Sequence, residues 1–168
     1  MFNKGEIWAY PTDTSFGLGV RVDDVLGLAN LEKLKKRQSG KFYSIMVSDF
    51  KMLQEFAIIP DNLDANFFTE KPRTVILEPT FKLPKSKFWP AKKVAFRIST
   101  LKKIAESIKY PITATSANIS GEESIFEIKS LKTNLNKEVK ICNFIEVLEK
   151  KSASEIWDFT VLPVKRIR

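Results

Sequence analysis

The stretch "PITATSANISGEES" (residues 111–124) passes from a strand-like run into a polar loop. If the backbone stays extended, Ser116 and Asn118 face the same side, where hydroxyl and amide groups suit the oxygens of a phosphate or a carboxylate. The same residues also suit a helix cap and a turn, so both interpretations remain open at this point. Six small side chains in this stretch can form hydrogen bonds, namely Thr113, Thr115, Ser116, Asn118, Ser120 and Ser124.

Strand-like and helix-like segments alternate on both sides of this stretch. Besides residues 111–116, strands are expected over residues 6–11, 43–48, 73–79, 93–99 and 139–145, with a terminal strand pair over 154–159 and 164–168. Helices are expected over residues 23–37, 48–58, 61–68, 99–109 and 124–135. The first is expected to be capped by Asp23 or Asp24, the second by Ser48 or Asp49, and the helix at 99–109 is also expected to be capped. This alternation predicts a single α/β domain over residues 1–168, with a twisted, mixed sheet.

The rare residue types narrow the possible chemistry. The chain has 168 residues, enough for one sizeable core. Its one cysteine, Cys142, excludes an internal disulfide and a thiolate metal cage, and is expected to be a small buried residue. The absence of histidine excludes serine–histidine and cysteine–histidine nucleophile systems and removes the commonest zinc ligand, so no protein-bound metal site is predicted.

The charge balance is strongly basic. Lysine and arginine number 28 against 20 acidic residues, which gives a net charge of +8. That excess favours anionic partners such as nucleotides or nucleic acid, although surface lysines also serve solubility. No apolar run reaches membrane-spanning length and the first residues do not resemble a signal peptide, so we expect a cytoplasmic protein without membrane contact.

Three further features point to a binding site. In "YPTDTSFGLG" (residues 10–19), hydroxyls follow a strand and the glycines allow close approach to a ligand. The alternative is a tight strand-to-helix turn held by local threonine and aspartate hydrogen bonds. In "KLKKRQSGK" (residues 33–41), cations gather at a helix end, where they could bind an anion or simply complement the helix dipole. Arg97 lies in an otherwise apolar strand, so it is either salt-bridged or a clamp for a ligand.

Taken in order along the chain, "YPTDTSFGLG", "KKRQSGKFYSIMV", "RTVIL", "KVAFRIS", "PITATSANISG" and "SEIWDF…RIR" resemble the YrdC/TsaC family. The resemblance implies a YrdC-like fold with a positively charged groove. It also implies an L-threonylcarbamoyladenylate synthase, a nucleotidyltransferase that makes threonylcarbamoyl-AMP and pyrophosphate from L-threonine, bicarbonate and ATP. Mg²⁺ is expected to arrive with ATP, and tRNA or double-stranded RNA and tRNA-modification proteins are the expected partners.

The resemblance also implies site residues. Thr12, Arg97 and Ser154 match positions that bind threonine. Lys35, Arg37, Ser116 and Asn118 match the catalytic Lys-x-Arg and Ser-x-Asn. The nucleotide contacts would be Lys35, Arg37, Ser116, Ser124 and Arg168, with Arg166 as the alternative late arginine.

Two alternatives remain. The chain could be a YrdC-like module that binds double-stranded RNA or tRNA without synthase activity, which the net charge of +8 permits. It could also form a carbamoyl-adenylate on another substrate, as hydrogenase-maturation relatives do, although those relatives carry additional domains.

Overall fold

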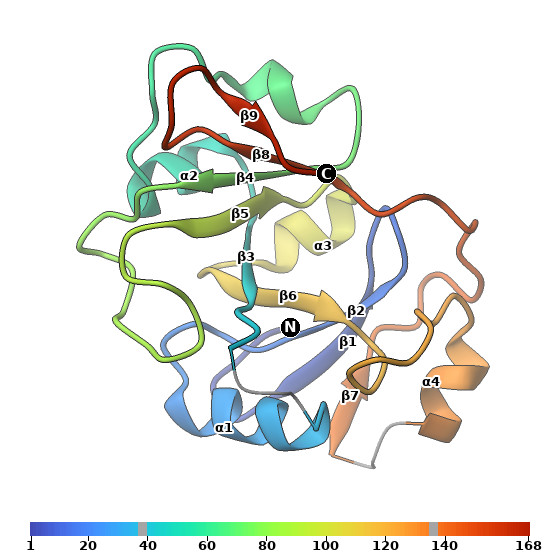
Figure 1. Cartoon of the computed structure of the whole chain (residues 1–168). Helices are drawn as coiled ribbons and strands as arrows, with labels where there is room; N and C mark the ends of the chain where they lie inside the picture. Colours follow the sequence, from blue (N-terminus) through green and yellow to red (C-terminus); the bar gives the residue numbers. More distant parts are fainter. Residues whose placement is uncertain (37–39, 135–137) are drawn as a thin grey trace.

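The computed structural model describes residues 1–36, 40–134 and 138–168, and Arg37 therefore lies outside the described residues. Within these ranges the strands form one sheet in the order β7-β1-β2-β6-β3-β5-β4-β8-β9, which Figure 1 shows as a twisted surface running from β9 to β7. The strands are β1 (Ile7–Pro11), β2 (Phe16–Gly19), β3 (Ser44–Val47), β4 (Arg73–Leu77), β5 (Val94–Ile98), β6 (Ile112–Ser116), β7 (Val139–Ile141), β8 (Glu155–Asp158) and β9 (Lys165–Arg166). The helices are α1 (Val25–Leu34), α2 (Phe50–Phe56), the 3₁₀ turn η1 (Ala65–Phe68), α3 (Lys102–Ser107) and α4 (Ile128–Asn134).

The sheet is mixed, which confirms the predicted fold class. The pairs β1–β7, β3–β5 and β4–β8 are parallel, and the other neighbours are antiparallel. The expected terminal pair is present as antiparallel β8 and β9. Parallel pairs need long connections, and in this chain those connections carry helices.

Side-chain caps begin α1 and α2 as the sequence predicts. The carboxylate of Asp24 accepts a hydrogen bond from the backbone N–H of Gly27 at 2.9 Å, and that of Asp49 accepts from Met52 at 2.8 Å. Each cap satisfies an otherwise unpaired helical N–H group. The prediction that the helix at 99–109 is also capped is wrong, because Leu101 takes the cap position of α3 without a side-chain hydrogen bond.

The two glycines of "FGLG" do not form the strand-to-helix turn that was one of the two predicted alternatives, and Gly17 lines the cavity described below. They lie in β2, which forms a hairpin with β1, rather than in a strand-to-helix turn. A side chain at Gly19 would come within 2.7 Å of the carbonyl of Thr113 and 2.9 Å of the Tyr10 ring. Glycine is therefore required because β2 is sandwiched between Tyr10 and β6.

Alternate residues of the strands supply two apolar clusters, one on each face of the sheet. Ala9 and Ile45 belong to the larger cluster, whereas Tyr10 and Met46 belong to the smaller one with Ile104 of α3. This follows from the two-residue period of a strand. Cys142 is buried in the smaller cluster, as expected, and burial raises the pKa of its thiol.

Within the described residues, no helix has both the length and the apolar character that crossing a bilayer requires.

Candidate functional site

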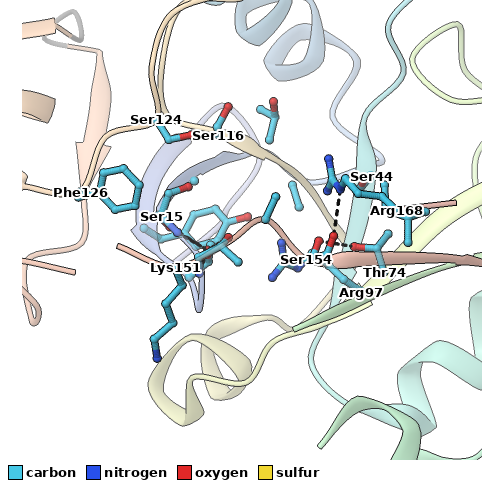
Figure 2. A pocket seen from close by; sticks show the side chains of 18 residues that line it. Ser15, Ser44, Thr74, Arg97, Ser116, Ser124, Phe126, Lys151, Ser154 and Arg168 are labelled. Atoms are coloured by element: carbon cyan, nitrogen blue, oxygen red, sulfur yellow. Dashed lines mark hydrogen bonds between the residues drawn. The ribbon is translucent and has the colours of Figure 1, made fainter. Parts of the chain in front are cut away.

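A cavity of about 320 Å³ opens over the centre of the sheet. Its walls come from the middle strands and from three loops that follow β1, β6 and β7, so segments far apart in sequence meet there (Figure 2). The cavity is of the size that holds a small ligand. Six residues predicted for the site line it, namely Thr12, Arg97, Ser116, Ser124, Ser154 and Arg168.

The loop after β1 is held by Thr12. Its hydroxyl donates to the carbonyl of Ser15 at 2.7 Å and accepts from the backbone N–H groups of Thr14 at 3.2 Å and Ser15 at 3.3 Å. This is the local hydroxyl turn that the sequence allowed as an alternative to ligand binding. The turn also presents all three hydroxyl-bearing residues to the cavity.

Arg97 lines the cavity from β5 with a partly satisfied guanidinium. One terminal nitrogen forms an ion pair with Asp13, and both side chains are only 12% exposed. The hydroxyl of Thr100 donates to the same carboxylate at 3.2 Å. Nε of Arg97 is buried and has no hydrogen-bond partner among the described residues. A buried donor left unpaired is costly, so an acceptor that reached this N–H would stabilise it.

Lys35 occupies a different environment. It is only 2% exposed, and its ammonium donates to the carbonyls of Ser116 at 2.6 Å and Asn118 at 2.7 Å. The carbonyl of Lys35 also accepts from the N–H of Ser120 at 3.0 Å. Lys35 therefore ties the end of α1 to the loop after β6. Its predicted contact with an anion stays a prediction.

Asn118 is turned into that loop. Its side-chain amide donates to the carbonyl of Glu122 at 2.5 Å, and its Oδ1 is buried without a partner among the described residues. Neither Lys35 nor Asn118 is among the described residues that line the cavity, whereas Ser116 is. Of the predicted catalytic group, Lys35, Ser116 and Asn118 are thus brought together around one loop.

Ser154 and Arg168 meet at one wall of the cavity. The hydroxyl of Ser154 lies 3.1 Å from that of Thr74, and its carbonyl accepts from Nε of Arg168 at 3.1 Å. Figure 2 shows Thr74, Ser154 and Arg168 grouped there. Arg166 instead forms an ion pair with Glu155 at 3.3 Å, so the late arginine at the cavity is Arg168.

Several lining residues were missed by the sequence reasoning. Thr74 is fully inside β4, and nothing in "RTVIL" distinguishes its hydroxyl from that of any strand threonine. Ser44, Phe126 and Lys151 lie in segments whose local pattern predicts only a strand or helix start, or a solvated charge run. The hydroxyls of Thr14 and Ser15 stand beside Thr12 in a motif that the sequence did single out.

The cavity is cationic. Among the described residues that line it, Arg97, Lys151 and Arg168 are basic and none is acidic. In the same described ranges, no cluster of three or more cysteine and acidic side chains could hold a metal ion. Burial raises the pKa of Tyr10, whose hydroxyl donates to the carbonyl of Thr113 at 3.3 Å, so this phenol stays neutral. The arrangement is suited to binding anions through cations and hydroxyls.

Comparisons with known proteins agree with this geometry. The sequence model of the Sua5/YciO/YrdC family, described as "Telomere recombination", matches residues 1–168. A threonylcarbamoyl-AMP synthase of Vibrio vulnificus (strain YJ016) is 28% identical over 163 residues, covering 92% of this chain and 88% of the relative. The enzyme of the same name from Wigglesworthia glossinidia brevipalpis is 31% identical over 144 residues, covering 81% and 74%.

A solved structure is also similar. The crystal structure of P. abyssi Sua5 complexed with L-threonine superposes with a TM-score of 0.81 at 25% identity, over 98% of this chain. The match covers 50% of that Sua5 chain, so this chain spans about half its length. Because the family model matches along the whole sequence and the fold agrees, the chain belongs to the Sua5/YciO/YrdC family.

Proposed function

We propose that this protein is a threonylcarbamoyl-AMP synthase, which forms threonylcarbamoyl-AMP and pyrophosphate from L-threonine, bicarbonate and ATP. The relatives from Vibrio and Wigglesworthia carry that name, and the Sua5 relative is a complex with L-threonine. The observation that carries the proposal is Nε of Arg97, a buried donor without a partner among the described residues, at the wall of a cationic cavity. A threonine carboxylate would satisfy it.

The reaction needs positioning more than acid–base chemistry. The threonine amine loses a proton to water or to a carbonate oxygen and attacks the carbon of bicarbonate. Water leaves, and a carbamate forms. A carbamate oxygen then attacks the α-phosphorus of ATP, and pyrophosphate leaves. Since the reactants carry several negative charges, cations that gather them reduce repulsion and set their orientation.

The described residues suggest a division of this work. Arg97, with Thr12 and Ser154, would hold the amino acid, and Ser116, Ser124 and Arg168 would contact the nucleotide. Lys35 and Asn118 would shape the loop that presents Ser116. Arg37 would add a further cation, as its motif predicts. Mg²⁺ would be held by the phosphates of ATP, because no carboxylate is found among the described residues that line the cavity.

The proposal is tested by measuring pyrophosphate release and by detecting the adenylate by mass spectrometry. We expect both to require L-threonine, bicarbonate and ATP together. A parallel reaction with the Vibrio enzyme serves as the positive control. If that control forms the product and this protein does not, the proposal is wrong.

RNA partners belong to the same proposal. The net charge of +8 favours tRNA or double-stranded RNA, and tRNA-modification proteins would receive the threonylcarbamoyl group in the cytoplasm. RNA affinity should fall linearly on a plot of log affinity against log salt concentration. RNA binding that does not depend on threonine or ATP, together with no synthesis, would favour a binding module instead.

A further inference from the structure

Phe126 is a half-buried aromatic ring at the wall of the cavity. Among the described residues that line the cavity, only Tyr10 and Phe126 are aromatic. Tyr10 is completely buried beneath the cavity and cannot offer a face to a ligand. Phe126 keeps part of its surface accessible. Of the two aromatic residues in the described lining, Phe126 is therefore the one on which a bound molecule can stack.

The core does not explain a phenylalanine at this position. Ile125 and Ile128, on either side of it in sequence, are each 7% exposed and belong to the larger apolar cluster. Phe126 is neither a member of that cluster nor one of the partly buried residues that pack against it. Its ring therefore lies outside both apolar clusters, at a cavity wall whose described residues are mostly polar or small, with Ile156 as the large aliphatic exception.

The backbone holds the ring at a fixed point. The carbonyl of Ile125 accepts from the N–H of Phe16 at 2.9 Å, and the carbonyl of Phe126 accepts from the N–H of Leu148 at 2.8 Å. The N–H of Ile128 donates to the carbonyl of Glu146 at 2.9 Å. These bonds tie the segment to β2 on one side and to the loop after β7 on the other. A platform held in this way loses little entropy when a ligand binds.

The neighbours of the ring divide the cavity into two ends. In Figure 2, Phe126 lies near Ser124, on the opposite side of the drawn lining from Thr74 and Arg168. Nζ of Lys150 lies 5.8 Å from the centre of the Phe126 ring, and Lys151 lines the cavity. Arg97 and Arg168 lie at the end with Thr74 (Figure 2), so a ligand that fills both ends can place a flat group on the Phe126 ring and anionic groups beside the two arginines.

We infer that Phe126 is the stacking platform for the adenine base of the nucleotide substrate. The inference rests on the proposed function, because it names the part of ATP that this end of the cavity recognises. Aromatic rings stack on bases by contact between flat faces, and such contacts do not depend on hydrogen bonds from the base. A triphosphate without a base lacks this contact.

The test compares ATP with inorganic tripolyphosphate, using calorimetry on the full chain. Phe126→Ala should weaken ATP binding about 30-fold, the middle of the range for one base stacked on an aromatic ring. Its affinity for tripolyphosphate and for L-threonine should not change. Phe126→Tyr keeps the flat face and should bind ATP as the wild type does, whereas Phe126→Leu keeps apolar bulk without the face and should behave like Phe126→Ala.

Each other outcome overturns the inference. Unchanged ATP affinity in Phe126→Ala, or wild-type affinity in Phe126→Leu, means that no ring–base contact exists. An equal loss of tripolyphosphate affinity means that the substitution damages the cavity in general. Because binding is measured without turnover, the two proposals can fail separately. If ATP binds through Phe126 but no adenylate forms, only the synthase proposal is wrong. If adenylate forms and Phe126→Ala binds ATP as the wild type does, only the stacking proposal is wrong.

Discussion

Lys35 at the end of α1 and Arg97 in β5 are both nearly buried cations, yet their donors are used differently. The ammonium of Lys35 is engaged by two backbone carbonyls, whereas Arg97 has one edge paired with Asp13 and keeps a buried N–H without a partner among the described residues. The first arrangement ties the end of α1 to the loop after β6, and in the second one donor lacks a partner among the described residues. Residue type and burial alone do not separate these roles, because the difference lies in which donors are already satisfied.

The largest effect is expected from removing the Lys35 ammonium. Lys35→Met keeps most of the apolar stem but leaves the carbonyls of Ser116 and Asn118 without their donor. Losing two charge-assisted hydrogen bonds should lower the free energy of unfolding by roughly 3 kcal/mol, and synthesis should fall with it. Urea unfolding and the pyrophosphate assay measure the two effects.

Lys33→Met is the matched control, because Lys33 is exposed in the last turn of the same helix. It should change stability by no more than about 0.5 kcal/mol. If Lys35→Met proves as stable as the wild type but inactive, the ammonium acts on a reactant, and the contrast with Arg97 disappears.

A smaller and more selective effect is expected at Arg97. Arg97→Lys keeps a positive charge near Asp13 but removes the Nε–H that faces no partner among the described residues. If that N–H binds the threonine carboxylate, KM for L-threonine should rise about 10- to 100-fold, with little change in KM for ATP. Steady-state kinetics with each substrate varied in turn would measure this.

Arg73→Lys provides the comparison for that variant. Arg73 is also an arginine of a sheet strand, with a side chain 11% exposed, but it pairs with Glu70 and Glu155 and is not among the described residues lining the cavity. The variant Arg73→Lys should leave KM for L-threonine unchanged. Equal changes in both variants would show that the effect reflects lost packing in the sheet rather than a ligand contact.

The smallest effect is expected at Glu6, whose ion pair with Lys140 lies at the β7 edge of the sheet. Hydrogen bonds from Lys140 and then Trp8 lower the pKa of Glu6 from 4.5 to about 2. A carboxylate with a lowered pKa stabilises the fold above its unfolded value and loses that contribution as the pH falls through its folded value. The contribution should therefore be present above pH 4.5 and disappear towards pH 2.

Glu6→Gln tests this. The variant should be less stable than the wild type at pH 6 by about 1 kcal/mol or less, since the Lys140 partner is largely exposed and screened by solvent. Unfolding measured from pH 6 to pH 2 should show the two proteins converging. A stability difference that stays constant down to pH 2 would contradict the lowered pKa of Glu6. A change in KM for L-threonine would contradict the view that the Glu6–Lys140 pair acts independently of the cavity.

Local pattern predicted much of the fold. The helix caps at Asp24 and Asp49 and the terminal strand pair depend on short-range spacing, and the structure confirms them. The strand-to-helix turn predicted at the glycines of "FGLG" is wrong because these glycines lie in β2, where Tyr10 and β6 approach closely. The predicted cap of α3 is wrong because Leu101 takes the cap position, while the hydroxyl of Thr100 donates to Asp13, 87 residues away in sequence.

For the candidate site, too, the sequence determined some features and the tertiary structure determined others. The sequence alone determined which chemical groups the site can contain. The absence of histidine, the basic charge and the motifs around Thr12 and Ser116 define the chemistry that the chain can perform. Only the tertiary structure decided the roles of individual side chains. It brought Thr74 and Phe126 to the cavity and directed Lys35 to backbone carbonyls, and it left Nε of Arg97 without a partner in the part of the chain that the structure describes. Hydrogen-bond satisfaction depends on neighbours that the folded sheet brings together from distant segments.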